Sequence, residues 1–341
     1  MKKQILVTGG TGYIGSHTAV ELINSGYEVV IVDNLSNSNI EVLERIKRIT
    51  GKMPVFEKFD ICEAEKVNLF FEKYPNIEAI IHFAAYKAVG ESVNFPVKYY
   101  RNNIMSLLNL LDGMAKYNVP NFVFSSSCTV YGQPDILPVT ENAPIKKALS
   151  PYGNTKQICE EIIQDALLPN KNLKTISLRY FNPIGAHKSA LIGELPLGVP
   201  ANLVPFITQT AIGLRKELSV YGNDYNTPDG SCIRDYINVV DLAKAHVVAI
   251  ERLIENKNKN TFDVFNIGTG NGLSVFEIIN TFEKVTSEKL NYKIVGRRAG
   301  DIEKVWADTT LANNELGWKA EETIENTILS AWNWEKNIRK K

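Results

Sequence analysis

The segment Thr8-Gly9-Gly10-Thr11-Gly12-Tyr13-Ile14-Gly15 decides the fold class of this chain. It follows a short apolar run at residues 4–7 and opens a helical pattern over residues 14–24, which Gly26 ends. Its glycines at 9, 12 and 15 form a G-x-x-G-x-x-G pattern. Glycines so placed permit a tight turn, let backbone N–H groups approach a pyrophosphate and let a helix pack closely on a strand. The segment therefore predicts a dinucleotide-binding turn between a first strand and a first helix.

An acidic residue after the second strand narrows the choice of dinucleotide cofactor. Residues 27–32 are typical of a buried strand, and Asp33 follows them, 18 residues after Gly15, close to the spacing of about 20 that dinucleotide-binding units show. Its carboxylate would accept hydrogen bonds from the adenosine ribose and repel a 2′-phosphate, which favours NAD over NADP. The alternative is an ordinary glycine turn followed by a solvated aspartate.

The first half of the chain alternates strands and helices. Further strands are expected at residues 79–85, 122–125 and 175–178, each separated from the last by a helical stretch. Buried apolar strands alternating with helices are typical of a parallel sheet covered on both faces. The expected fold class is α/β: a Rossmann-type doubly wound parallel sheet with a smaller, partly discontinuous α/β substrate-binding domain.

The alternation stops after Tyr180. Residues 181–235 are rich in Pro, Gly and Asn and contain one clear helical pattern, near residues 205–214. So long an irregular segment in a compact enzyme is typically functional. Helices are again expected at residues 241–253 and 275–285, and a strand at 264–267. We expect an NAD-binding domain at residues 1–180, with a crossing segment near 236–265, and a mainly substrate-binding domain at 181–341.

The composition excludes several classes of protein. The chain has 341 residues, enough for two domains of about 150 residues each. Its 38 Lys and Arg residues balance 38 Asp and Glu residues, which argues against a general binder of nucleic acid or of membranes, since both need an excess of cations. No apolar run approaches the about 20 residues of a membrane span, and the apolar stretch after Met1-Lys2-Lys3 is too short for a signal peptide. The cysteines at 62, 128, 159 and 232 lie far apart. This spacing excludes a zinc ribbon and a disulfide framework, and we expect no metal site. Unpaired cysteines are typical of the reducing cytoplasm, where we expect the protein to be located.

A second motif, Ser150-Pro151-Tyr152-Gly153-Asn154-Thr155-Lys156, opens a helix, with Ser150 suited to the N-cap. Tyr152 and Lys156 are four residues apart and share a helix face. A free tyrosine has a pKa of about 10 and is a poor base at neutral pH, but a neighbouring ammonium favours the phenolate. Such a pair is common on protein surfaces. Downstream of a dinucleotide turn, it predicts a catalytic base and its partner.

Three serines, Ser125 to Ser127, end the strand expected at residues 122–125. Ligands of open parallel sheets bind at the carboxyl ends of the strands, so a serine there can bridge a substrate hydroxyl and Tyr152. Thr129 could also reach the substrate. Serines at strand ends are also ordinary turn formers, and Ser125 and Ser126 are expected to be structural.

These motifs resemble the extended short-chain dehydrogenase/reductase superfamily and, within it, the UDP-glucose 4-epimerase (UDP-galactose 4-epimerase) family. The resemblance covers nearly the whole chain. The segments that carry it are TGGTGYIGSHTAVEL, VDNLSNS, HFAAYKAVGESV, FSSSCTVYG, SPYGNTK, LRYFNPIGAH, GNDYNTPDGSCIRDYINVVDLAKAH and FNIGTGNGLSV. Residues 222–246 are the most specific, because a generic Rossmann enzyme has no reason to carry them.

The resemblance implies reversible, NAD-dependent epimerisation at C4 of UDP-hexoses, UDP-glucose and UDP-galactose, through a transient 4-keto intermediate. It selects Ser127 among the three serines and makes Tyr152 the base, with Lys156 on the nicotinamide ribose. It also implies a cytoplasmic homodimer built from two long helices near residues 92–117 and 155–168. Neither a nucleic-acid nor a membrane partner is expected.

The resemblance also assigns the binding residues. Besides Ser127, Tyr152 and Lys156, the expected cofactor contacts are Gly9, Gly12, Tyr13, Ile14, Gly15, Asp33, Asn34, Leu35, Ser36, Asn37, Ser38, Asp60, Ile61, Phe83, Ala84, Ala85, Lys87, Asn102 and Phe181. Besides Ser127 and Tyr152, the expected substrate contacts are Asn182, Asn202, Leu203, Tyr221, Arg234, Arg298 and Asp301. Arg234 and Arg298 suit a diphosphate, because guanidinium groups bind phosphate oxygens well. Of the adjacent Arg297 and Arg298, only one is expected to face inward.

Val305 bears on the range of substrates. Family members with a tyrosine at this place tend to exclude N-acetylated sugars, and those with a small residue tend to admit them, so valine implies that UDP-GlcNAc and UDP-GalNAc are also substrates. The alternative is that Val305 merely packs beside Trp306 and that another side chain closes the pocket.

Two other functions stay open at this point. A nucleotide-sugar 4,6-dehydratase needs an acid and a base to eliminate water, and its family pattern places an Asp-Glu pair after the residue that corresponds to Ser127. Residues 128–132 contain no carboxylate. A catalytically silent NAD-binding regulator would be expected to lose Tyr152 or Lys156, and both are present.

Overall fold

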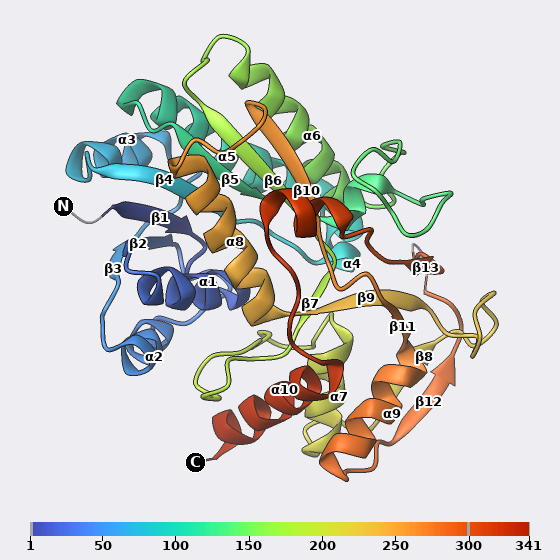
Figure 1. Cartoon of the computed structure of the whole chain (residues 1–341). Helices are drawn as coiled ribbons and strands as arrows, with labels where there is room; N and C mark the ends of the chain where they lie inside the picture. The colour runs from blue at the N-terminus through green and yellow to red at the C-terminus, as the bar shows by residue number, and fades with distance from the viewer. Residues whose placement is uncertain (1–2, 299–300, 341) are drawn as a thin grey trace.

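The computed structural model describes residues 3–298 and 301–340. Its centre is a seven-stranded sheet in the order β10-β6-β5-β4-β1-β2-β3, in which all pairs are parallel (Figure 1). The strands are β1 (Gln4–Thr8), β2 (Glu28–Asp33), β3 (Val55–Lys58), β4 (Ile77–His82), β5 (Asn121–Ser125), β6 (Lys174–Tyr180) and β10 (Phe262–Ile267). The chain runs outward from β1 to β3 and then returns to β4 on the other side of β1. In doubly wound sheets, ligands bind where the strand order reverses in this way, here at the carboxyl ends of β1 and β4.

Helices cover both faces of this sheet. Ile5 and Val7 of β1 belong to one apolar cluster, together with residues of α1 (Tyr13–Asn24), α2 (Glu41–Thr50) and α8 (Val239–Ile254). Leu6, between them, belongs to a second cluster with α3 (Ala64–Lys73), α5 (Pro96–Tyr117) and α6 (Pro151–Leu167). Successive side chains of a strand point to opposite faces, so a strand that is apolar throughout requires a helical layer on each side. The sequence predicted this doubly wound arrangement, and the structure confirms it.

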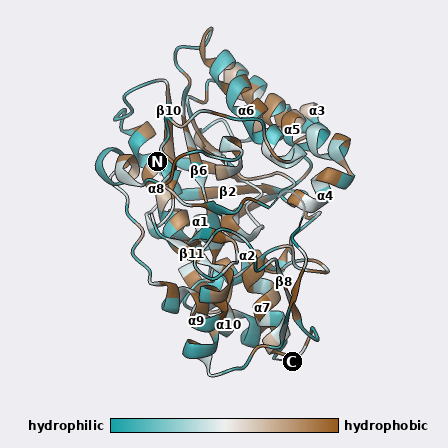
Figure 2. Ribbon diagram, turned by 90° about the vertical axis from the view of Figure 1, so that its right-hand side faces the viewer, coloured by the Kyte–Doolittle hydropathy of each residue, from teal (hydrophilic) through white to brown (hydrophobic). Residues whose placement is uncertain are grey.

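A second, smaller group of elements lies beyond the carboxyl ends of the large sheet (Figure 1). The strands β7 (Asn182–Ile184), β9 (Ile233–Asn238), β11 (Gly272–Ser274) and β13 (Lys304–Val305) form one small sheet, and β8 (Leu218–Tyr221) pairs with β12 (Tyr292–Val295). The helices α7 (Leu203–Ala211), α9 (Val275–Thr286) and α10 (Ile324–Arg339) pack around them on a separate core. Figure 2 shows α7, α9 and α10 gathered at the end of the molecule away from α5 and α6.

The chain crosses between the two groups. From β9 it enters α8, which lies alongside α1, and it then joins the large sheet as the edge strand β10 (Figure 1). Two further short helices are η1 (Cys128–Tyr131) and η2 (Ala312–Leu316). The division into domains at residue 180 stays a prediction. Of the described residues, no helix has both the length and the apolar character that crossing a bilayer requires.

Three expectations about the elements need correction. The strand expected at residues 79–85 ends at His82, because the next residues leave the sheet to form a loop. The helix expected at 92–117 is two helices, α4 (Val89–Asn94) and α5, because Phe95 takes a non-helical backbone before Pro96. The segment 181–235 contains β7, β8 and the start of β9 as well as α7.

Candidate active site

The glycine turn forms a close-packed cradle at the start of α1. Gly9 has a φ of +68°, and a Cβ built on it would lie 2.8 Å from the backbone nitrogen of Ala84, in the loop that follows β4. A Cβ on Gly15 would overlap the carbonyl oxygen of Gly9. The N-cap residue of α1 is Gly12, which offers no side-chain cap to the first N–H groups of the helix. Those groups can therefore bind an anion.

The loop after β2 is organised around Asp33. Its carboxylate accepts hydrogen bonds from the backbone N–H of Thr11 (3.2 Å), the backbone N–H of Leu35 (2.9 Å) and the hydroxyl of Ser38 (3.1 Å). Leu35 takes a positive φ of 61°, a strained conformation that is common at ligand-binding sites. The loop thus joins the glycine turn, and an ionised carboxylate has acceptor sites left for a ribose hydroxyl.

The expected adenine side lies next to this loop. The Asn34 side chain donates to Asp60 at 2.9 Å, and the backbone N–H of Cys62 donates to the same carboxylate at 2.9 Å. Burial raises the pKa of Asp60, but these donors, together with the Cys62 thiol and the charge of Lys66, outweigh burial and hold the pKa below its usual value. The structure therefore brings residues 33–38 and Asp60 together.

A buried asparagine that the sequence analysis missed connects the loop after β4 to α6. Asn103 accepts from the backbone N–H of Tyr86 (2.9 Å) and donates to the Tyr86 carbonyl (3.0 Å) and to the Thr155 hydroxyl (3.1 Å). The expected cofactor residue Asn102 donates to it at 2.9 Å. Asn103 thereby fixes the loop at residues 83–87 against the helix that carries Tyr152. An asparagine beside Asn102 was the only signal in the sequence.

The expected catalytic side chains meet where β5 ends and α6 begins. Ser150 caps α6 by accepting from the Gly153 N–H at 3.1 Å, as the sequence predicted. Ser127 is the N-cap residue of η1, two residues after β5. Its hydroxyl accepts from the backbone N–H of Thr129 at 3.2 Å and lies close enough to Tyr152 to lower the pKa of that phenol. Lys156 donates to the carbonyl of Ser125 at 2.6 Å. Ser127, Tyr152 and Lys156 are all buried.

The electrostatics of this group differ from the sequence expectation. Burial raises the pKa of Tyr152 above its usual value, Tyr180 raises it further, and the hydrogen bond from Ser127 lowers it. Burial lowers the pKa of Lys156 to about 8, although Cys159 and Glu160 oppose that shift. We expected the ammonium to lower the pKa of the phenol. In the chain alone the pKa of Tyr152 is nevertheless raised, because burial is the largest influence on it, so the effect expected of the ammonium stays a prediction.

Several expected substrate residues cluster on the smaller group of elements. Arg298 pairs with Asp301 at 2.8 Å and lies over the ring of Tyr221. The neighbouring Arg297 is instead held by Asp224 at 2.8 Å. The two residues between Arg298 and Asp301, Ala299 and Gly300, lie outside the described residues.

The remaining expected substrate residues come from β7, α7 and β9. Asn182 begins β7, Asn202 is the N-cap residue of α7, and Leu203 is the first residue of that helix. Arg234 in β9 lies opposite Val305 in β13. Val305 is buried in one cluster with Phe181 and Tyr131.

Glu194 links an expected cofactor residue, Lys87, to an expected substrate residue, Asn202, and the sequence analysis missed it. Its Oε1 atom binds the Lys87 ammonium at 3.0 Å and accepts from the Asn202 amide at 2.6 Å. Glu194 lies in an irregular segment without a motif, so no local pattern could have indicated it.

The strand-end motif offers hydroxyls and a thiol, but no carboxylate. Thr129 Oγ1 is buried and has no hydrogen-bond partner among the residues that the structure describes. Burial raises the pKa of the Cys128 thiol to about 12, which makes it a poor acid–base group at neutral pH. Within the described part of the chain, no group of three or more His, Cys, Asp or Glu residues could hold a metal ion.

Known proteins are similar to this chain over nearly its whole length. The family model described as GDP-mannose 4,6 dehydratase matches residues 6–330. The chain is 50% identical to the UDP-glucose 4-epimerase of Bacillus subtilis (strain 168) over 331 residues, which cover 97% of this chain and 96% of that protein.

Two solved structures extend this comparison. The UDP-glucose-4-epimerase from Stenotrophomonas maltophila, with bound NAD and formylated UDP-arabinopyranose, superposes with a TM-score of 0.95 at 46% identity, covering 98% of each chain. The UDP-Glc/GlcNAc 4-epimerase from Campylobacter jejuni has a TM-score of 0.84 at 35% identity, covering 98% of this chain and 99% of that chain.

Proposed function

The chain belongs to the UDP-glucose 4-epimerase family, and from this premise we propose how its own residues perform the reaction. The protein is an NAD-dependent enzyme that interconverts UDP-glucose and UDP-galactose by inverting C4 through a 4-keto intermediate. The observation that carries the proposal is that Ser127, Tyr152 and Lys156 are buried where β5 ends and α6 begins, at the same edge of the sheet as the glycine cradle.

The residues of the cradle fit NAD. The close approach at Gly9 and Gly15 leaves no space for side chains where a pyrophosphate would lie, and the first turn of α1 faces the same place. Asp33 would hold the adenosine ribose and repel a 2′-phosphate. When bound, NAD supplies a reversible acceptor for the hydride at the sugar C4.

The protein's own groups handle the proton and hold the sugar. Tyr152 accepts the proton of the 4-hydroxyl, and Ser127 bridges the two oxygens. Because burial opposes ionisation of Tyr152, the positive charges of Lys156 and of the nicotinamide must favour the phenolate in the complex. Arg234 and Arg298 bind the diphosphate, so the 4-keto sugar can turn over without leaving. Tyr152 then returns the proton to the epimer, and no net oxidation results.

The family model that names a dehydratase does not change this assignment. Loss of water would need a further acid and base next to the sugar, whereas Cys128 and Thr129 follow Ser127 here. A silent NAD-binding regulator is disfavoured because Tyr152 and Lys156 are both present and buried together.

One assay tests the function. Purified protein is offered UDP-galactose without added NAD, and the nucleotide released on denaturation is identified. We expect UDP-glucose as the product and NAD or NADH as the nucleotide. NADP, or full activity with no bound nucleotide, would contradict the cofactor assignment, and a 4-keto-6-deoxy product would identify a dehydratase.

The range of substrates is a finer proposal. We infer that UDP-GlcNAc and UDP-GalNAc are also epimerised, because Val305 is small and lies opposite Arg234 and in one cluster with Phe181. The Campylobacter jejuni neighbour, named for both UDP-Glc and UDP-GlcNAc, supports this inference. The alternative is that another side chain closes the pocket, and turnover of N-acetylated UDP-sugars by the unmodified protein and by Val305→Tyr distinguishes the two.

The protein is further proposed to be a cytoplasmic homodimer. Four free cysteines favour a reducing compartment. Exposed apolar side chains of α5, among them Val97, Met105 and Leu108, offer a surface for a second copy.

A further inference from the structure

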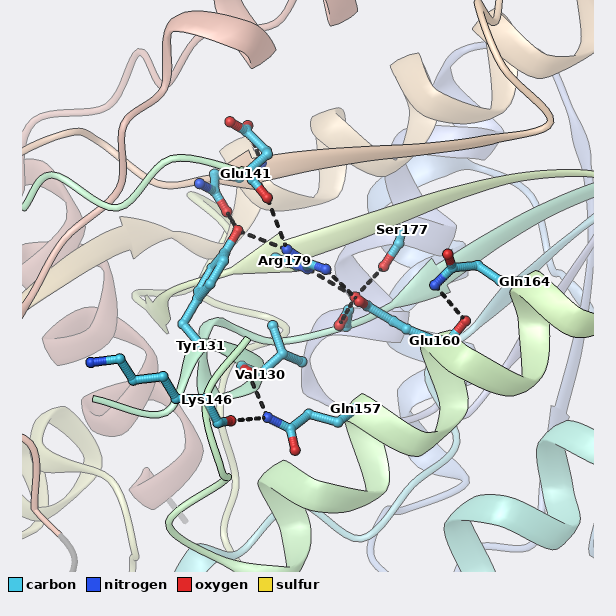
Figure 3. Close-up of polar contacts among 11 residues, drawn as sticks. Val130, Tyr131, Glu141, Lys146, Gln157, Glu160, Gln164, Ser177 and Arg179 are labelled. Atoms are coloured by element: carbon cyan, nitrogen blue, oxygen red, sulfur yellow. Dashed lines mark hydrogen bonds and ion pairs between the residues drawn. The ribbon is translucent and has the colours of Figure 1, made fainter. Parts of the chain in front are cut away.

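A buried ion pair joins the helix of the catalytic tyrosine to the large sheet. Glu160, in α6, binds Arg179, in β6, through two contacts: Nη2 to Oε2 at 2.6 Å and Nε to Oε1 at 3.0 Å. Figure 3 shows the two side chains facing each other between these elements. The side chains are only 5% and 8% exposed. A paired geometry of this kind is strong and directional, but a buried ion pair is by itself weak evidence for stability.

The pair contacts a side chain on each side of Ser127. Before Ser127, the Ser126 hydroxyl donates to Glu160 Oε1 at 2.6 Å. After it, Tyr131 at the end of η1 accepts from Arg179 Nη1 at 3.1 Å and donates to Asn266 at 2.6 Å. The short segment that carries the catalytic serine is therefore anchored at each end to one member of the pair.

The same helix carries the other catalytic groups. Tyr152, Lys156 and Glu160 follow one another at intervals of four residues and so lie on one face of α6. Gln157 lies about one turn before Glu160 in α6. Its side chain donates to the carbonyl of Val130 at 2.7 Å, and Val130 lies in the segment between Ser126 and Tyr131 (Figure 3). Any shift of α6 along β5 would thus change the separation of Ser127 and Tyr152.

We propose that Glu160 and Arg179 are positioning residues of the epimerase, which hold Ser127 at the distance from Tyr152 that proton transfer needs. This inference rests on the proposed function. The competing explanation is that the pair only joins α6 to β6 in the core. Ser126, expected from the sequence to be structural, becomes the connection between the pair and the catalytic serine.

The structure provides a matched pair of variants. Ser126 and Ser177 are both fully buried, and both donate to the same oxygen, Glu160 Oε1, at 2.6 and 2.7 Å. Ser126 is adjacent to Ser127, whereas Ser177 lies inside β6 and is adjacent to no catalytic residue. Ser126→Ala and Ser177→Ala therefore remove equivalent hydrogen bonds and differ in whether Ser127 loses its anchor.

The experiment measures kcat and KM for UDP-galactose, retained NAD and the melting temperature of the holoenzyme. We expect Ser126→Ala to lower kcat about tenfold or more, since small misplacements of reacting groups are costly, with KM and NAD content unchanged. Ser177→Ala should keep nearly the wild-type kcat at a similar melting temperature. Tyr131→Phe, which removes the second anchor, should also lower kcat at constant KM, and it takes the place of Ser126→Ala if that variant fails to fold.

The contrary results are distinct. Equal kcat values for Ser126→Ala and Ser177→Ala, or a wild-type kcat in both Ser126→Ala and Tyr131→Phe, would overturn the positioning role and leave the pair as a core contact. A wild-type protein that does not convert UDP-galactose would instead overturn the proposed function itself.

Discussion

The phenol of Tyr152 combines two opposing requirements. It must be buried to exclude water from the 4-keto intermediate, yet burial raises its pKa and disfavours the phenolate. Within the chain, the hydrogen bond from Ser127 is the influence that lowers the pKa. We therefore expect the side chain to act as a base only in the complex, where substrate and cofactor complete its surroundings.

Removal of that phenol gives the first prediction at the residue scale. Tyr152→Phe keeps the ring and its packing, so NAD content and UDP binding should be unchanged. Turnover of UDP-galactose should fall by about 10²–10⁴-fold, the contribution typical of a general base. Steady-state kinetics and calorimetric titration with UDP measure the two effects. Near-normal turnover would mean that another group takes the proton.

The second prediction at the residue scale concerns Val305. Val305→Tyr should abolish turnover of UDP-GalNAc and spare UDP-galactose, because the phenol ring would fill the space that an acetamido group needs when the sugar turns over. Val305 packs against other buried apolar side chains, so Val305→Ile and the melting temperatures serve as controls for packing damage. If the unmodified protein converts UDP-galactose only, Val305 does not set the substrate range.

At the scale of elements, structure that depends on neighbouring residues could be predicted from the sequence, whereas pairings between distant residues could not. The unit β1-turn-α1-β2 could be predicted because its glycines, apolar runs and Asp33 lie within one short stretch of sequence. The strands β8 and β12 could not, because each is stabilised by the other across 70 residues of chain. The break between α4 and α5 was missed although Pro96 was visible, since the apolar pattern continues through it.

The same contrast applies to the site. The Tyr152–Lys156 spacing and the Ser150 cap are local and were found. Glu160, Arg179 and Glu194 acquire their roles only when distant segments meet, and no spacing in the sequence relates Glu160 to Ser126 or Glu194 to Lys87. The rise in the pKa of Tyr152 was also not predicted, because it depends on burial rather than on neighbours in the sequence.

The fit of α1 against the glycine turn gives the prediction at this scale. Gly15→Ala places a methyl group against the Gly9 carbonyl oxygen, so the turn or the helix must move, at a cost of about 1–3 kcal/mol in the free energy of unfolding. We expect the protein to lose bound NAD during purification and to need added NAD for activity. Gly90→Ala is the control, because its methyl group would meet open space. Full NAD content in Gly15→Ala would show that the cradle does not hold the pyrophosphate.

At the scale of the whole molecule, the crossing of the chain explains how the two groups of elements act together. β9 carries Arg234, and the helix α8 that follows it packs on α1, the helix of the cofactor turn. Asp235, next to Arg234, accepts from the backbone N–H groups of Thr269 (2.8 Å) and Ala307 (3.2 Å). The expected diphosphate residue is thus connected both to the end of the large sheet and to the segment that carries Val305.

The surface of the molecule leads to the last prediction. Val97, Met105 and Leu108 of α5 are 63%, 43% and 37% exposed, and their spacing places them on one side of the helix. If this stripe packs against a second copy, a charge placed in it must lose water or break the contact. Met105→Glu should therefore shift the protein from dimer to monomer in sedimentation velocity. Leu69→Glu, on the exposed face of α3, should leave the dimer intact. A wild-type monomer would refute the dimer, whereas a dimer that survives Met105→Glu would place the interface on another surface.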